Sequence, residues 1–147
     1  MKVSTKYFGE VESNLTEVIQ FPYGLPGFER EKQFILLPFG TDTDSPFHVL
    51  QSITRAEVAF IVADVFQFFP EYEVEISESD VLALELENEY RTALWGLITI
   101  KEPFAESTMN LVAPVVINVD KKLAKQSFKD QTTYTRKERL FRQVKEG

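Results

Sequence analysis

The chain has 147 residues, no cysteine and one histidine, and its formal net charge is −7. This length suits one domain with a hydrophobic core of its own. The lack of cysteine excludes disulfide bonds, thiolate metal ligands and a cysteine nucleophile.

The charge is divided unevenly along the chain. Residues 1–118 include 7 basic and 19 acidic side chains, whereas residues 119–147 include 9 basic and 4 acidic ones. The acidic part repels nucleic-acid phosphates and favours a basic partner. The basic part, which ends in a tail over about residues 136–147, either binds phosphate or folds back on the acidic part. We favour the second interpretation.

No targeting or membrane segment is evident in the sequence. Residues 1–6 lack the apolar core of a secretion signal, and no apolar run approaches the roughly 20 residues that cross a membrane. We therefore expect a soluble cytoplasmic protein without membrane contact.

Short strands are predicted throughout the first half of the chain. Alternating or continuous apolar residues indicate strands over residues 2–8, 10–13, 17–21, 34–39, 47–52 and 59–65.

The loop after the third predicted strand, Phe-Pro-Tyr-Gly-Leu-Pro-Gly-Phe-Glu at residues 21–29, is rich in turn residues. Its Tyr-Gly and Pro-Gly pairs favour turns with positive φ at glycine. Leu25 and Phe28 are too apolar for a bare solvent loop. The loop is therefore either a packed connection between strands or a partner-binding loop that exposes Tyr23 or Phe28.

Three aromatic residues follow the sixth predicted strand within four positions, at Phe66, Phe68 and Phe69. This density is more than one strand face needs. Core packing is the favoured role for each residue, and exposed apolar area for a partner is the alternative.

Residues 71–76 alternate strictly, which predicts a strand with Glu71, Glu73 and Glu75 on one exposed face. Ser77 is expected to cap a short helix over residues 78–84, with Asp80 at its third position. The densest carboxylate cluster consists of Glu71, Glu73, Glu75, Glu78, Asp80, Glu85, Glu87 and Glu89. A solvated face is the favoured interpretation, a docking surface for a basic partner comes second, and metal binding or catalysis comes last.

The second half of the chain predicts further strands. They are expected over residues 91–101 with Gly96 as a bulge, 110–119 with an interruption at Pro114, 121–128 and 131–134. Residues 136–145 suit a short exposed helix or an extended tail. The whole chain, residues 1–147, therefore predicts one all-β domain, a barrel or sandwich of many short antiparallel strands with one or two short helices.

The residue pattern does not point to catalysis. His48 is the single histidine, and we expect a structural role for it. The sequence has no Gly-x-Ser-x-Gly elbow, no phosphate-binding glycine loop and no dinucleotide fingerprint. We expect no enzymatic activity, no cofactor and no metal.

The loop at residues 21–29 and the segment Asn-Leu-Val-Ala-Pro-Val-Val-Ile-Asn at residues 110–118 together resemble the FliW flagellar assembly factor family. The order of the rest is also similar, with Leu-Gln-Ser at 50–52, Phe-Phe-Pro-Glu-Tyr at 68–72 and a strand over 95–101. The resemblance spans residues 3–141 and implies a compact β-barrel-like fold.

The resemblance also implies a non-catalytic regulator that binds the RNA-binding translational repressor CsrA and also binds flagellin. When flagellin is scarce, the free factor holds CsrA. When flagellin accumulates, it occupies the factor and CsrA is released. We expect a monomer when free and no direct contact with nucleic acid. The candidate partner-binding residues are Glu71, Glu73, Glu75, Glu78 and Asp80 for the basic partner, and Tyr23, Leu25, Phe28, Phe66, Phe68 and Phe69 for apolar contacts.

Two alternatives from other functional classes stay open. A small β-barrel that binds single-stranded nucleic acid also presents aromatic side chains, although the acidic body opposes it. A carboxylate-based hydrolase needs a concave site with two unequal acids.

Overall fold

The structure is a computed structural model that describes residues 1–39, 45–88, 91–129 and 132–141. Its described strands are β1 (Lys2–Ser4), β2 (Glu10–Glu12), β3 (Ile19–Gln20), β4 (Gln33–Pro38), β5 (Phe47–Ser52), β6 (Ala59–Asp64), β7 (Thr92–Thr99), β8 (Thr108–Met109), β9 (Val115–Asn118), β10 (Leu123–Gln126) and β11 (Glu138–Arg139). The α-helices among these residues are α1 (Val65–Phe68) and α2 (Glu78–Ala83), and single 3-10 turns occur at Leu15–Glu17 and Phe104–Glu106.

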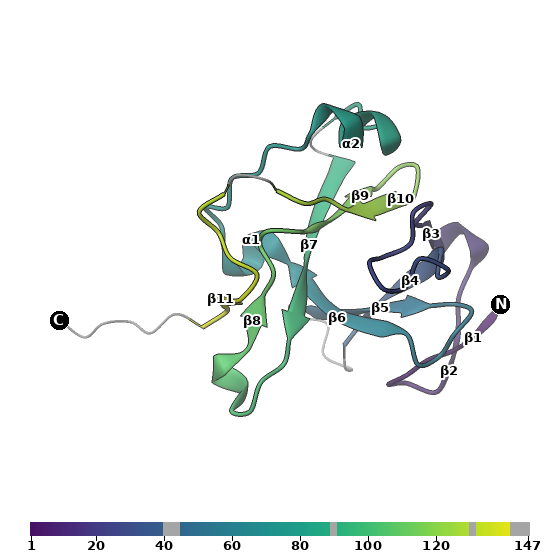
Figure 1. Cartoon of the computed structure of the whole chain (residues 1–147). Helices are drawn as coiled ribbons and strands as arrows, with labels where there is room; N and C mark the ends of the chain where they lie inside the picture. The colour runs from purple at the N-terminus through teal and green to yellow at the C-terminus, as the bar shows by residue number, and fades with distance from the viewer. Residues whose placement is uncertain (40–44, 89–90, 130–131, 142–147) are drawn as a thin grey trace.

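Seven strands close into a barrel in the order β7-β6-β5-β4-β3-β10-β9, and β9 pairs back with β7. All these pairs are antiparallel except the contact between β10 and β3, where Leu123 lies opposite Gln20. Because the sheet closes on itself, each of the seven strands pairs with a neighbouring strand on both of its sides. The predicted all-β barrel is therefore confirmed (Figure 1).

Two smaller strand pairs extend the barrel at opposite ends (Figure 1). The hairpin β1–β2 lies at one end, with Val3 opposite Val11. At the other end, β8 pairs antiparallel with the end of β7 on one side and with β11 on the other. The carboxy-terminal segment is therefore part of the fold up to Leu140, which is buried.

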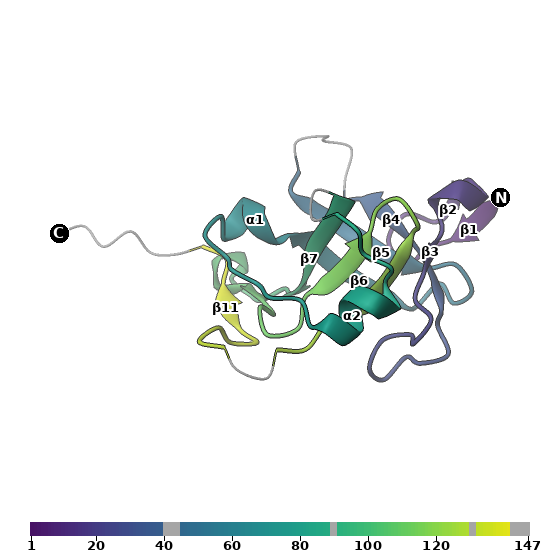
Figure 2. The ribbon, with the colours of Figure 1, turned by 90° about the horizontal axis from the view of Figure 1, so that it is seen from above.

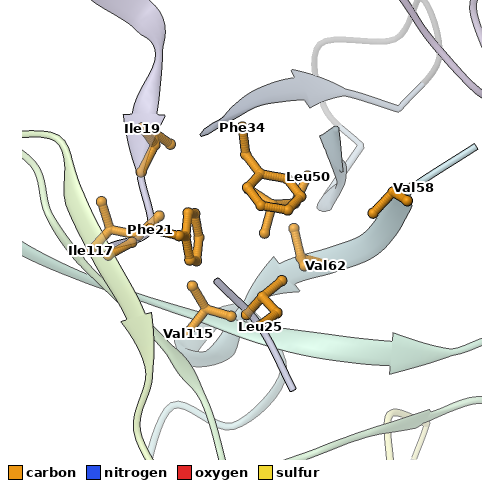
Figure 3. Close-up of a cluster of buried hydrophobic side chains, with 10 residues drawn as sticks. Ile19, Phe21, Leu25, Phe34, Leu50, Val58, Val62, Val115 and Ile117 are labelled. Carbon is orange, nitrogen blue, oxygen red and sulfur yellow. The ribbon is translucent and has the colours of Figure 1, made fainter. Parts of the chain in front are cut away.

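The barrel interior is filled by aliphatic and aromatic side chains from many strands (Figure 3). Phe21 and Phe34 meet edge to face, with ring centroids 4.9 Å apart. The cluster comprises Ile19, Phe21, Leu25, Phe34, Leu50, Val58, Val62, Val115, Ile117 and Ala124. Because strand residues alternate between the two faces of a sheet, the same strands also present a second set of apolar residues outside the barrel.

The outer apolar cluster is covered by the chain between β6 and β7. This connection contains α1 and α2 and runs along the outside of the barrel (Figure 2). The buried residues of the outer cluster are Ala63, Val65, Phe69, Tyr72, Leu84, Leu94, Met109, Leu111, Val116 and Leu140. The connection therefore packs on the barrel through its own apolar residues.

Gly96 in β7 has a packing role rather than the predicted bulge, because β7 is continuous from Thr92 to Thr99. A Cβ atom at this position would collide with the Met109 side chain. The small residue therefore lets Met109 lie directly over β7.

Several strand predictions in the second half of the chain were wrong. Residues 71–76 are extended and alternate between exposed and buried, but they belong to no strand. The alternation arises because one face of the segment packs on the barrel and the other faces solvent. Such a pattern does not require a neighbouring strand. The predicted strand over 110–119 is confined to β9, because Asn110 forms an Asx turn through its side chain, whose Oδ1 accepts hydrogen bonds from the N–H groups of Val112 and Ala113.

The predictions for the chain end need two further corrections. Residues 132–134 form no strand, and the final described strand is β11 instead. Residues 136–141 form a turn and that short strand rather than a helix. The rest of the predicted tail, residues 142–147, lies outside the described residues.

Among the described residues, no helix has both the length and the apolar character that a membrane crossing requires.

Candidate functional site

The loop at residues 21–29 is folded back on the barrel by two local backbone contacts. The Gly24 N–H donates to the Phe21 carbonyl at 2.8 Å, and the Phe28 N–H donates to the Leu25 carbonyl at 2.7 Å. Gly24 has φ +64°, and a Cβ atom there would lie 2.6 Å from the Cα of Glu29. Glycine is therefore required at this position both by conformation and by space.

The three candidate residues of this loop have different environments. Leu25 is buried in the barrel core, so it offers no exposed apolar area, contrary to expectation. Phe28 is partly exposed and packs edge to face on Phe60 at 5.2 Å. Tyr23 is 60% exposed. The loop is a packed connection, and Tyr23 is its most accessible candidate.

Asp80 is held in a network of hydrogen bonds and is 7% exposed. Its carboxylate lies 2.6 Å from the Lys125 ammonium and accepts a hydrogen bond from Ser127 at 2.5 Å. The predicted Ser77 cap is confirmed, because its Oγ accepts the Asp80 N–H. Asp80 therefore fixes α2 to β10 and presents no exposed carboxylate for docking.

The environment of Asp80 also controls its charge. Burial disfavours the carboxylate, but the hydrogen bonds from Lys125 and Ser127 and the positive charge of Lys125 outweigh burial and hold the Asp80 pKa below its usual value. Lys125 also lies over the Tyr23 ring, 5.0 Å from its centroid. Lys125 therefore connects the loop at residues 21–29 to α2.

Residues 71–77, here called the acidic strap, begin in a turn at Glu71 and are extended from Tyr72 onward. Glu71, Glu73 and Glu75 are exposed on it, whereas Tyr72 is buried. The Tyr72 hydroxyl donates to the Leu111 carbonyl at 2.7 Å. Burial, with a smaller contribution from Tyr134, raises the pKa of Tyr72 to about 12. Glu78 follows the strap and is exposed in the first turn of α2.

The carboxy-terminal part of the chain also holds the acidic strap. The Lys129 ammonium donates to the Glu75 carbonyl at 2.6 Å, and the Glu73 N–H donates to the Tyr134 hydroxyl at 3.3 Å. Burial lowers the pKa of Lys129. Together with the Lys121–Glu85 and Lys125–Asp80 ion pairs, these contacts support the interpretation that basic residues after position 118 fold back on the acidic body.

The three phenylalanines near α1 also have different environments. Phe66 is 44% exposed, Phe68 is half-buried and Phe69 is buried. Phe69 therefore has the favoured core-packing role and adds no exposed apolar area for a partner. Phe66 and Phe68 lie within α1, whereas Phe69 follows the helix with φ −132° and ψ 71°.

A groove of 760 Å³ lies beside the acidic strap, and we call it the strap groove. It brings the exposed Phe66 together with Glu73 and Glu75. The remaining lining residues are Tyr72, Val74, Ile76, Val81, Leu86, Glu87, Asn88, Thr92 and Leu94. The groove is thus mainly apolar, with carboxylates among its lining residues. Tyr23, Leu25, Phe28, Glu78 and Asp80 do not line it.

A second hollow of 590 Å³ lies along the same strap and is more polar. Lys129, Phe128 and Thr132 line it together with Glu73 and Glu75. Sequence patterns did not single out Leu86, Leu94 or Lys129 as site residues. The basic character of residues 119–147 was the available signal for Lys129, whereas the two leucines looked like ordinary core residues.

Four phenylalanines form a ring of contacts near the chain end. Phe47 contacts Phe68 and Phe104, and Phe141 contacts the same two rings, with centroid distances between 5.5 and 6.1 Å. Phe104 and Phe141 remain partly exposed. This cluster packs the end of the described chain against α1.

His48 packs edge to face on Trp95 at 4.9 Å, and its buried Nδ1 has no hydrogen-bond partner among the described residues. Within the same part of the chain, no group of three or more His, Asp or Glu side chains is arranged to hold a metal ion. The carboxylates of the acidic strap are instead directed to solvent.

Comparison with known proteins identifies the family. The sequence matches the model described as FliW protein over residues 2–140. This chain belongs to the FliW family. Among FliW relatives, the flagellar assembly factor FliW of Anoxybacillus flavithermus is 44% identical and covers 100% of this chain and 99% of its own length. That of Bacillus subtilis strain 168 is 40% identical, with 93% of this chain and 94% of the relative covered.

A solved structure supports the same assignment. The crystal structure of a flagellar assembly factor FliW superimposes with a TM-score of 0.90 at 38% sequence identity, and covers 97% of this chain and 99% of that chain. The FliW fold is therefore shared along nearly the whole sequence, and the family match includes residues 137–139 at the carboxy end.

Proposed function

We propose that this protein is a non-catalytic, cytoplasmic flagellar assembly factor that binds the translational repressor CsrA and flagellin in exchange. The family assignment supports a role in flagellar assembly. The identity of the partners rests on the family resemblance described from the sequence. The free factor would hold CsrA, and binding of flagellin to the factor would release CsrA.

The strap groove is the observation that carries the proposal. It combines apolar lining residues with the exposed acids Glu73 and Glu75. An amphipathic helix from the end of flagellin needs an apolar receptor of this kind. A basic RNA-binding protein is attracted by the exposed carboxylates, and their negative potential repels the RNA that CsrA would otherwise bind.

Calorimetric titration with purified CsrA tests the proposal, with and without saturating flagellin. We expect CsrA to bind and pre-bound flagellin to abolish that binding. CsrA binding that survives flagellin would contradict simple exchange and retain the CsrA role. The absence of binding to either partner, confirmed by size-exclusion chromatography, would contradict the whole proposal.

A pair of variants links the binding to the groove. Phe66→Ala removes an exposed apolar side chain from the groove, and we expect flagellin affinity to fall by about tenfold. Leu82→Ala is the control, because Leu82 is 73% exposed on α2 and does not line the groove. Equal affinities of the two variants would place flagellin elsewhere.

A further inference from the structure

The backbone of the acidic strap has two unequal edges. In an extended segment, the backbone N–H and C=O groups of successive residues point to opposite edges. Glu73 and Glu75 therefore direct their groups to the same edge. That edge is engaged, because the Glu73 N–H donates to Tyr134 and the Glu75 carbonyl accepts from Lys129.

The opposite edge of the strap is open. It carries the backbone groups of Val74 and Ile76, and within the described parts of the chain these groups form no hydrogen bond. Lys129 and Tyr134 hold the other edge, so the open edge is directed away from them, and both Val74 and Ile76 line the strap groove. The strap thus resembles the edge strand of a sheet, with free donors and acceptors that a second strand can pair with.

The groove beside this edge has a defined chemistry. Val74, Ile76, Leu86 and Leu94 provide apolar lining. Glu87 joins Glu73 and Glu75 as an exposed acid that lines the groove. A matching segment is apolar at alternate positions and carries Lys or Arg at the others. It must also be extended, because a helix uses its backbone groups internally and cannot pair with the strap.

We propose that the open edge of Val74 and Ile76 receives an extended, basic and apolar segment of a protein partner by strand addition. This proposal rests on the proposed function, since the basic partner is CsrA. It adds a mode of binding in which main-chain hydrogen bonds give affinity and the glutamates select a basic sequence.

Solvent exchange of individual backbone amides, measured by NMR on isotopically labelled protein, tests the proposal. In the free protein, the amides of Val74 and Ile76 are expected to exchange rapidly. With saturating CsrA, both should slow by at least about tenfold, because a paired amide exchanges only when the added strand opens. The Glu75 amide points to the opposite edge and should keep its rate.

The alternating pattern separates strand addition from simple coverage. Slowing of Val74, Glu75 and Ile76 together would indicate general burial and would overturn strand addition. Unchanged rates at Val74 and Ile76, in a sample that calorimetry shows to be saturated, would overturn it while the proposed function stands. No CsrA binding by calorimetry would overturn both proposals.

Discussion

Asp80 and Lys125 form an ion pair with their charged atoms 2.6 Å apart, and this pair joins α2 to β10. Ser127 from the end of β10 and the capping Ser77 add further hydrogen bonds to Asp80. One member of the acidic cluster is therefore used to position the helix that follows the acidic strap. A buried aspartate thus fixes the helix next to the exposed glutamates.

Substitution of Asp80 with Asn should lower the free energy of unfolding by about 1–3 kcal/mol near neutral pH, because a charge-assisted network is lost. Since the pKa of Asp80 is lowered in the folded state, its carboxylate stabilises the fold above the ordinary value of 3.8. That stabilisation is lost as the pH falls through the folded-state value. Urea unfolding at several pH values should therefore show that the difference in free energy of unfolding between wild type and variant shrinks as the pH falls below 3.8.

Glu78→Gln is the control for the Asp80 prediction, because Glu78 is exposed in the same helix. It should change stability by no more than about 0.5 kcal/mol. A difference between wild type and Asp80→Asn that is constant with pH would show that the lost stability comes from packing rather than from the charge.

Gly24→Ala and Gly27→Ala form a matched pair in the loop at residues 21–29. Both glycines have positive φ, but only at Gly24 would the added Cβ meet backbone, at 2.6 Å from the Glu29 Cα. We expect about 1 kcal/mol of destabilisation for Gly27→Ala and at least about 2 kcal/mol more for Gly24→Ala. Thermal unfolding of the two variants measures the difference, and similar melting temperatures would contradict a backbone collision.

Tyr72→Phe removes the hydrogen bond to the Leu111 carbonyl, and we expect a loss of about 1–2 kcal/mol of stability. Because the Tyr72 pKa is raised from 10.0 to about 12, the stability linked to its hydroxyl is complete below pH 10 and falls as the pH rises to about 12. Ultraviolet absorbance titration should show a late ionisation of Tyr72 that disappears in the variant. Tyr7→Phe alters an exposed tyrosine and should leave the late step intact.

Glu71→Lys combined with Glu73→Lys should weaken CsrA binding by about tenfold or more and leave the fold intact, because both side chains are exposed. Calorimetry across a salt series should show that wild-type affinity falls with salt more steeply than that of the variant. Glu102→Lys with Glu106→Lys makes the same change in net charge on a different exposed segment. Equal weakening of CsrA binding by both pairs would indicate a general charge effect. A wild-type affinity that does not change with salt concentration would contradict an electrostatic role.

Local patterns in the sequence correctly predicted those structural features that depend only on residues close together in the chain. The Ser77 cap is one example, and the alternating exposure of residues 71–76 is another. Alternation cannot tell whether another strand lies alongside, and for this reason a strand was predicted where the structure has an unpaired segment. Barrel closure likewise depends on which distant strands pair, and it followed from the family resemblance.

The candidate site depended on contacts between distant residues, and the sequence was less informative there. Asp80 looked like one more exposed acid because its partners Lys125 and Ser127 come from β10 and its end. Phe66 and Phe69 are three positions apart, yet Phe66 is exposed within α1 and Phe69 is buried just after it, where the backbone leaves the helix with φ −132° and ψ 71°. That Phe66, Glu73 and Glu75 line one groove could be seen only from the three-dimensional path of the chain.

The closure of the barrel has a consequence for the order of folding. Gln20 near the start of the chain pairs with Leu123 near its end, and β9 pairs with both β7 and β10. Contacts between such distant segments carry a large loop-closure entropy and form late. During synthesis the barrel cannot close until β10 has emerged, so the edges of β3 and β9 remain available for wrong pairing until then. Lys125, Ser127 and Lys129 also emerge only at this stage, and the acidic strap therefore acquires its final position only after β10 and the residues that follow it have been made.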